Sequence, residues 1–151
     1  MKIAIISGSV YGTAEEVARH AESLLKAAGH DAWHAARATQ QDLEGFAPEA
    51  LLAVTSTTGM GELPDNLMPL YSSIRDTLPA AWRGLPGAVI ALGDSSYGDT
   101  YCGGGEQLRE LFAELGVREL QPMLKLDASE TVTPETDAEP WLAAFALALT
   151  A

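Results

Sequence analysis

Short apolar runs alternate with helical patterns along the whole chain of 151 residues. The runs that predict β-strands are residues 2–7, 31–36, 50–57, 87–94 and 117–127. The stretches with apolar residues at helical spacing are residues 13–28, 63–78, 106–115 and 139–149. Such alternation is typical of a parallel sheet with right-handed crossovers and helices on both faces. We therefore expect a single α/β domain over residues 1–151, with Pro122 marking an edge or a break in the last strand.

The composition argues against several classes of protein. Acidic residues number 21 and basic residues 9, giving a net charge of −12, which repels nucleic acids and attracts a partner with a basic docking face. Acidity that only keeps a protein in solution is the simpler explanation of that charge. A single cysteine, Cys102, rules out an internal disulfide framework, and together with three scattered histidines it argues against zinc. No secretory signal or membrane-spanning run is visible, so we expect a cytoplasmic protein.

Ligands of an open parallel sheet bind beyond the carboxyl ends of its strands, so the loops after the first, third and fourth strands are of interest. The first loop, residues 7–13, is rich in glycine and hydroxyl side chains and contains no lysine or arginine. It matches neither the P-loop nor the dinucleotide fingerprint. Its amides and hydroxyls, with the positive end of the next helix, can hold a phosphate monoester. A plain turn with a serine or threonine cap explains the same residues equally well.

The second loop, residues 55–66, reads TSTTGMGELPDN. Its glycines allow the backbone to approach a ligand closely. The same residues are also consistent with the start of a helix that has Glu62 or Asp65 as its N-cap and Pro64 near its first position.

The third loop, residues 93–105, contains Tyr97, Tyr101 and three consecutive glycines. A tyrosine on a mobile glycine-rich loop is suited to stack on a flat ring, whereas an Asx-type turn with tyrosines at its rim is the simpler alternative. No combination of acid, base and nucleophile accompanies the three loops, so we predict no catalytic residues and no metal ligands. Together the loops favour a phosphorylated planar cofactor that supplies the chemistry itself.

Three motifs, in this order, resemble those of the flavodoxin family. GSVYGTAEE is similar to the phosphate loop G-S-x-T-G-T-A-E-E, STTGMGELPDN to S-T-x-G-x-G-(D/E)-x-x-D-N, and GDSSYGDTYC to G-D-S-S-Y-x-x-F-C. The resemblance covers essentially the whole chain. It is strongest to the short-chain, MioC-type flavodoxins and extends to the flavin mononucleotide (FMN) domains of diflavin reductases.

The resemblance implies a flavodoxin-like three-layer sandwich with a five-stranded parallel sheet in the order 2-1-3-4-5. It also implies a monomeric, low-potential one-electron carrier with non-covalently bound FMN. Its partners would be an NADPH-dependent flavodoxin or ferredoxin reductase and an acceptor redox enzyme with a basic docking face, with no role for nucleic acid or membrane. An FMN-dependent quinone reductase on the same fold is the alternative.

The resemblance also assigns roles to residues. Residues 9–14 would wrap the phosphate, with a further hydroxyl from Ser56, and residues 57–61 would line the flavin ring, with the Gly59 carbonyl facing N5. Tyr97 would stack on the ring, and Tyr101 is the alternative because this segment is one residue longer than the family motif. The full set of expected FMN-binding residues is Ser9, Val10, Tyr11, Gly12, Thr13, Ala14, Ser56, Thr57, Thr58, Gly59, Met60, Gly61, Gly93, Asp94, Tyr97, Tyr101 and Cys102.

Two departures from the family motifs lead to further expectations. Tyr11 replaces a threonine and removes one phosphate hydroxyl, and Thr58 replaces an aromatic residue, which predicts a more open ring face and weaker binding. Acidic residues lie in or beside all three loops and would lower the second reduction potential and steer basic partners. They are Glu15, Glu16, Glu62, Asp65, Asp94 and Asp99. Glu15 and Glu16 are equally well explained as first-turn acids that stabilise a helix N-terminus.

Overall fold

The computed structural model describes residues 1–58 and 60–150, and its centre is a parallel sheet. The strands lie in the order β2, β1, β3, β4, β5, and β6 also pairs with β4. Their bounds are β1 Lys2–Gly8, β2 Asp31–His34, β3 Ala50–Thr55, β4 Pro86–Gly93, β5 Arg118–Glu119 and β6 Leu124–Asp127. The predicted parallel sheet and its strand order are confirmed.

The fifth predicted strand forms as two pieces along the same edge. β5 pairs with Pro86 and Gly87 of β4, and β6 pairs further along β4, up to Asp127 opposite Gly93. Pro122 lies between the two pieces, where its lack of an N–H group cannot interrupt a sheet ladder. The predicted edge position and the predicted break are therefore both present.

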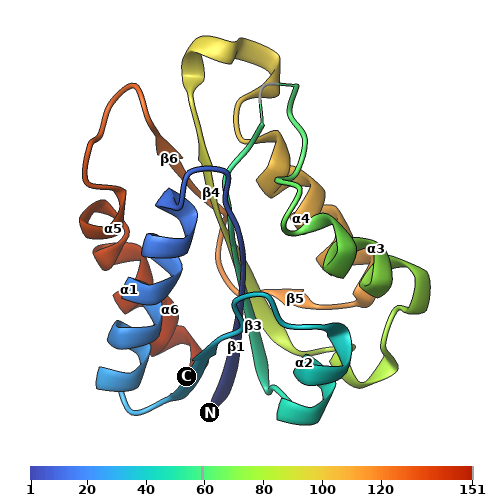
Figure 1. The fold of residues 1–151 in the computed structure, drawn as a ribbon. Helices are drawn as coiled ribbons and strands as arrows, with labels where there is room; N and C mark the ends of the chain where they lie inside the picture. The colour runs from blue at the N-terminus through green and yellow to red at the C-terminus, as the bar shows by residue number, and fades with distance from the viewer. Residues whose placement is uncertain (59, 151) are drawn as a thin grey trace.

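Helices cover both faces of the sheet (Figure 1). One face carries α1, α5 and α6, and the other carries α2, α3 and α4. Their bounds are α1 Thr13–Ala27, α2 Gln40–Phe46, α3 Met68–Thr77, α4 Gly103–Leu115, α5 Pro134–Asp137 and α6 Glu139–Leu149. Successive strand residues enter opposite cores: Ile3 and Ile5 pack beneath α1 and α6, whereas Ala4 and Ile6 pack toward α3. The part of a strand that is buried on both faces has to be apolar, as residues 3–6 of the first predicted strand are.

Two predicted helices differ from the structure at their ends. The first helix was predicted to reach residue 28, but α1 ends at Ala27, and Ala28 is exposed because the chain turns at Gly29 with φ 93°. α3 begins at Met68 with Leu67 as its N-cap, so the predicted start at residue 63 and the predicted caps Glu62 and Asp65 are wrong. The apolar face predicted for this helix is nevertheless buried, at Leu67, Leu70, Tyr71 and Ile74.

Two short helices were not predicted. α2 has seven residues and one buried side chain, Leu43, so it carries no readable periodicity. A capping box fixes its start: the Thr39 hydroxyl accepts from the Asp42 N–H, and the Asp42 carboxylate accepts from the Thr39 N–H. α5 is a single turn that follows a bend in the chain.

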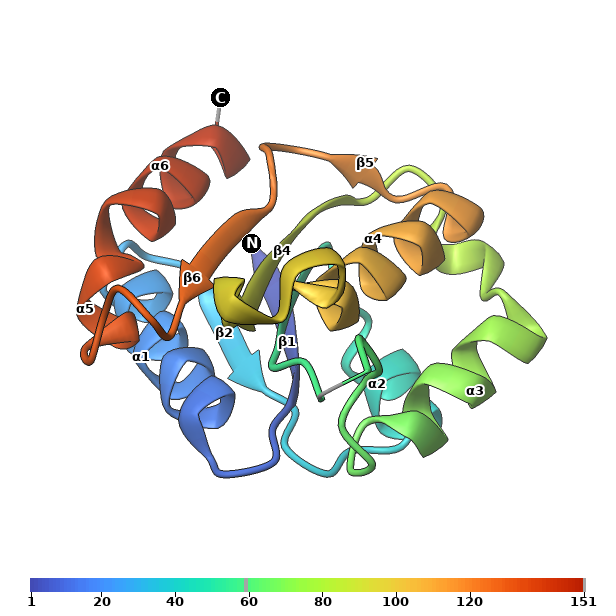
Figure 2. The same ribbon diagram turned by 90° about the horizontal axis from the view of Figure 1, so that it is seen from above.

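The three consecutive glycines form the first turn of α4 and not a loop, which corrects the prediction for residues 103–105. A Cβ on Gly103 would lie 2.6 Å from the Gly61 carbonyl oxygen, and one on Gly104 would lie 2.6 Å from that of Ser56. Glycine therefore lets the start of α4 pack directly against the loop after β3. Figure 2 shows α4 beginning beside the segment that follows β4.

Candidate functional site

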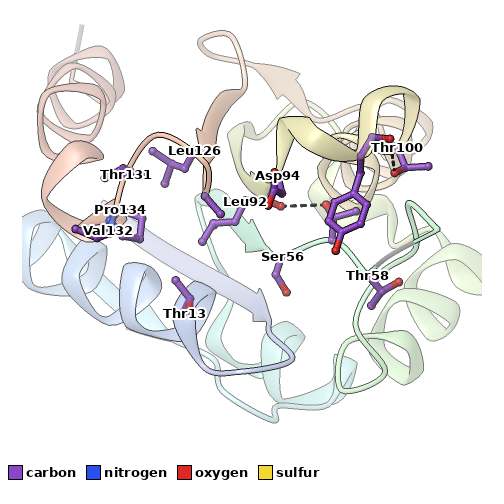
Figure 3. Close-up of a pocket in the computed structure, with 14 residues that line it drawn as sticks. Thr13, Ser56, Thr58, Leu92, Asp94, Thr100, Leu126, Thr131, Val132 and Pro134 are labelled. Atoms are coloured by element: carbon purple, nitrogen blue, oxygen red, sulfur yellow. Dashed lines mark hydrogen bonds between the residues drawn. The ribbon is translucent and has the colours of Figure 1, made fainter.

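The loops that leave the carboxyl ends of the strands surround a cavity of about 450 Å³ (Figure 3). Hydroxyl side chains of Thr13, Ser56 and Thr58 line part of it. A second cavity of about 340 Å³ shares these residues and reaches Ser9 and Tyr11 of the first loop. The two cavities together place an open, partly apolar space beside the N-terminus of α1.

Most of the expected FMN-binding residues line one or both cavities. These are Ser9, Val10, Tyr11, Thr13, Ser56, Thr57, Thr58, Gly93, Asp94 and Tyr97. Within the described chain, the expected residues that line neither cavity are Gly12, Ala14, Met60, Gly61, Tyr101 and Cys102. Gly59, expected to face flavin N5, lies outside the described residues.

The first loop leaves the N-terminus of α1 open. Gly12 is the N-cap with φ 88°, and no side chain of the described residues caps this helix. The Ser9 hydroxyl instead accepts from the Gly12 N–H (2.7 Å), and the Asn66 side-chain oxygen accepts from the Ser9 N–H (3.1 Å). The alternative of a serine or threonine cap is therefore not what forms. An uncapped helix N-terminus is a site where backbone N–H groups can bind an anion.

The second loop is tied to its neighbours by the hydroxyl of Thr57. This hydroxyl donates to the Leu92 carbonyl (3.0 Å) and accepts from the Gly104 N–H (3.1 Å), so it joins the ends of β3 and β4 to the start of α4. The loop then closes on itself, because the Thr58 N–H donates to the Glu62 carbonyl at 2.9 Å. The hydroxyl of Thr57 thus stabilises the wall of the cavity.

The two tyrosines of the third loop lie in different surroundings. Tyr97, in the 3₁₀ helix η2 (Ser95–Thr100), lines both cavities and is 61% exposed. Tyr101 is half-buried beside Gly93, and its ring centroid lies 5.8 Å from Nζ of Lys125. Burial is the main reason that the pKa of Tyr101 is raised to about 12. Of the two, only Tyr97 stands where it can cover a ligand in the cavities.

Tyr11 and Cys102 also differ in their access to a ligand. The Tyr11 side chain is 96% exposed at the tip of the first loop, so its ring extends into solvent. Cys102 is fully buried at the start of α4, and burial raises the pKa of its thiol. A buried thiol with a raised pKa is a poor nucleophile.

One wall of the larger cavity was not predicted. It comes from β6, the segment after it and the first residue of α5, and it includes Leu126, Thr131, Val132 and Pro134. Figure 3 shows these four residues across the cavity from Asp94, Thr58 and Thr100. This segment follows the carboxyl end of a strand that pairs with β4, so the rule used for the other loops also applies to it. The prediction did not consider the loop after this strand.

His34 lies below the first loop, with Nε2 2.7 Å from the Ser7 hydroxyl. Burial lowers the pKa of His34 from 6.5, and this effect outweighs the opposing effect of Glu22 and Glu15. Above about pH 6.5 both the folded and unfolded chains hold this histidine neutral, whereas at lower pH the unfolded chain takes up the proton first. We therefore expect wild type to lose stability as the pH falls below 6.5, and His34→Gln to lose less. Melting temperatures at about pH 7.5 and pH 5.5 test this, and equal losses in the two proteins would contradict it.

The fold and the cavities define an α/β protein with an open site at the carboxyl edge of its parallel sheet. The family model described as Flavodoxin matches residues 5–141. The chain therefore belongs to the flavodoxin family, which confirms the resemblance.

Individual relatives agree with the family. The chain is 41% identical to Flavodoxin YqcA of Escherichia coli over 93% of each chain, and 34% identical to Protein MioC of the same species over 95% of each. The solved structure of a cysteine-to-serine variant of a flavodoxin from Pseudomonas aeruginosa is 75% identical over the whole of both chains, with a TM-score of 0.97. In the part of this chain that the structure describes, no helix has the length and apolar character needed to cross a bilayer.

Proposed function

We propose that this chain binds FMN non-covalently and carries electrons one at a time from an NADPH-dependent flavodoxin or ferredoxin reductase to an acceptor redox enzyme. The observation that carries the proposal is the uncapped N-terminus of α1 beside a cavity walled by Tyr97. An anion-binding helix end next to an aromatic wall fits a ligand with a phosphate at one end and a flat ring at the other. The protein would act as a monomer in the cytoplasm.

The residues of the first loop suit a phosphate. Gly12 has a positive φ, and a Cβ atom added to it would have no other atom within 4 Å. The first loop therefore leaves room over the N-terminal end of α1. The hydroxyl of Thr13 and the amides of the first turn of α1 would hold the phosphate, without a cationic side chain. The hydroxyl of Ser56 lies at the junction of the two cavities and would add a further donor.

The larger cavity suits the ring. Leu92, Leu126 and Val132 supply apolar surface, and Tyr97 supplies an aromatic face. FMN, when bound, supplies the ability to accept and release single electrons. The chain would hold the ring, exclude water from part of it and surround it with negative charge. That charge disfavours adding an electron to the ring and lowers the reduction potential.

Acidic residues at the rim would guide the partners. Glu62, Asp65 and Asp99 are exposed around the cavities, on a chain whose net charge is −12. Their field would steer a partner with a basic docking face and would do so less at high salt. Glu15 has a further contact, an exposed ion pair with Arg19 at 3.3 Å, which is the pairing expected on a helix surface.

Titration of the purified protein with FMN tests the proposal. We expect flavin fluorescence to be quenched with one FMN per chain, and a redox titration of the loaded protein to show two separate one-electron potentials. The loaded protein alone is expected not to oxidise NADPH, and to be reduced once an NADPH-dependent flavodoxin reductase is added. Absence of quenching would contradict the proposal that FMN is the cofactor. Rapid NADPH or quinone turnover without a reductase would indicate an enzyme instead of a carrier.

A further inference from the structure

The carboxylate of Asp127, at the end of β6, joins two walls of the larger cavity. Its Oδ1 accepts from the Ser95 N–H (3.1 Å), the Ser129 N–H (3.0 Å) and the Ser129 hydroxyl (2.8 Å). The hydroxyl oxygens of Ser95 and Ser129 are themselves 3.1 Å apart. These bonds keep the pKa of Asp127 well below its usual range, so the carboxylate is charged near neutral pH.

On one side of this bridge, Ser95 is the first residue of η2, the helix that carries Tyr97. The bonds inside η2 are local: the Tyr97 N–H donates to the Asp94 carbonyl (3.0 Å), and the Asp94 carboxylate accepts from Ser96. Such bonds hold the shape of η2 but do not fix it against the sheet. The bond from Ser95 to Asp127 comes from a different strand and therefore locates the start of η2 relative to β6.

On the other side, Ser129 leads into the segment that supplies Thr131 and Val132 to the opposite wall. Figure 3 shows Thr131 and Val132 across the cavity from Asp94. Residues 128–130, 132 and 133 are all exposed, so little packing holds this segment in place. One carboxylate thus bonds both segments that border the cavity.

We propose that Asp127 is a positioning residue that sets Tyr97 over the cofactor cavity by hydrogen-bonding the start of η2 and the β6–α5 segment. The proposal rests on the proposed function, because the ligand in question is FMN. Asp127 would act through the geometry of its acceptor oxygen, and its charge would contribute only through the general field of the acidic rim.

A double-mutant cycle with Tyr97 separates positioning from charge. Asp127→Ala removes the acceptor, whereas Asp127→Asn keeps an oxygen acceptor and removes the charge. We expect Asp127→Ala and Tyr97→Ala each to weaken FMN binding about tenfold in fluorescence titrations, and Asp127→Asn to stay within about threefold of wild type. Because Asp127 would act through Tyr97, the double alanine variant should bind about as well as Tyr97→Ala alone. Additive effects, or an asparagine variant as weak as the alanine variant, would overturn the proposal.

A second pair of variants keeps Asp127 intact and so remains informative where Asp127→Ala folds poorly. Ser95→Pro removes the N–H that donates to Asp127, at the first position of a helix where proline is tolerated. Ser95→Ala is the matched control, since it keeps the N–H and loses only the hydroxyl. We expect residual flavin fluorescence to rise in Ser95→Pro and to stay near wild type in Ser95→Ala. Equal fluorescence in the two variants would contradict the proposal.

Hydrogen exchange in the FMN-free protein tests the same geometry without a ligand. The Ser95 amide is expected to exchange at least about tenfold faster in Asp127→Ala than in wild type, and at nearly the wild-type rate in Asp127→Asn. Failure of the wild-type protein to bind FMN would contradict the proposed function, but the exchange rates would still test whether Asp127 fixes the Ser95 amide. If wild type binds FMN but the Ser95 amide exchanges at the same rate in Asp127→Ala as in wild type, the positioning role of Asp127 is contradicted and the proposed function is not.

Discussion

Replacing Thr13 by aspartate is expected to weaken FMN binding by about 30- to 150-fold. Thr13 is the first residue of α1 and lines both cavities, so a carboxylate there would occupy the place proposed for the phosphate. Two like charges about 4 Å apart repel by about 4 kcal/mol near a protein surface, and the exposure of Thr13 reduces this to about 2–3 kcal/mol. Fluorescence titration with FMN measures the loss.

Two controls make this result specific to the phosphate. Thr13→Asn has the shape of the aspartate variant without its charge and is expected to retain binding within about fivefold. Riboflavin lacks the phosphate, so its affinity should be nearly the same for both variants. Unfolding is a poor explanation of the loss, because an aspartate at a helix N-terminus stabilises the helix by about 0.3–1 kcal/mol. If Thr13→Asp weakens the binding of FMN and of riboflavin equally, the phosphate does not bind beside Thr13.

Gly105→Ala is expected to lower the free energy of unfolding by about 2 kcal/mol, although alanine is the better helix former. A Cβ on Gly105 would lie 2.3 Å from the Ala91 Cβ and 2.9 Å from the Met123 Sδ, so α4 has to move away from β4. For a chain of this length the melting temperature should fall by about 4–8 °C. Thermal unfolding followed by circular dichroism measures it.

Gly45→Ala is the matched control for this substitution. Gly45 also lies in a helix, α2, but a Cβ built there has no neighbour within 4 Å. The same exchange is therefore expected to stabilise the protein by about 0.5–1 kcal/mol. A Gly105→Ala variant as stable as wild type would show that the start of α4 can shift without loss.

The central apolar strands could be predicted because they are buried on both faces, whereas the strand order was implied by the resemblance to the flavodoxins. β1 and β3 are nearly continuous runs of apolar residues, which leaves a parallel central sheet as the arrangement that covers them. The longer helices could also be predicted from the spacing of their apolar residues, and α6 has the predicted bounds. Short elements that are held by a few local bonds could not be predicted. Examples are α2, which begins at a capping box, and the single turn of α5.

The candidate site was predictable only in part, for a similar reason. Its first three loops carry their own signals, namely glycines, hydroxyl residues and tyrosines next to buried strands. The choice between Tyr97 and Tyr101 depends on how the chain turns after Gly93, and a motif does not contain that information. The fourth wall, with Val132 at its rim, is assembled by the pairing of β6 with β4 across a break in the strand.

The sequence by itself determined the layer architecture and pointed to the edge of the sheet that carries the candidate site, and it predicted the kind of ligand that we propose for that site. These features follow from local patterns, because the spacing of apolar residues shows which faces are buried and the residue types of a loop show its chemistry. Only the tertiary structure decided that the three glycines begin α4, that α1 stays uncapped and that Asp127 bonds Ser95 across 32 positions. Each depends on close packing or on hydrogen bonds between residues distant in the chain, which no local pattern records.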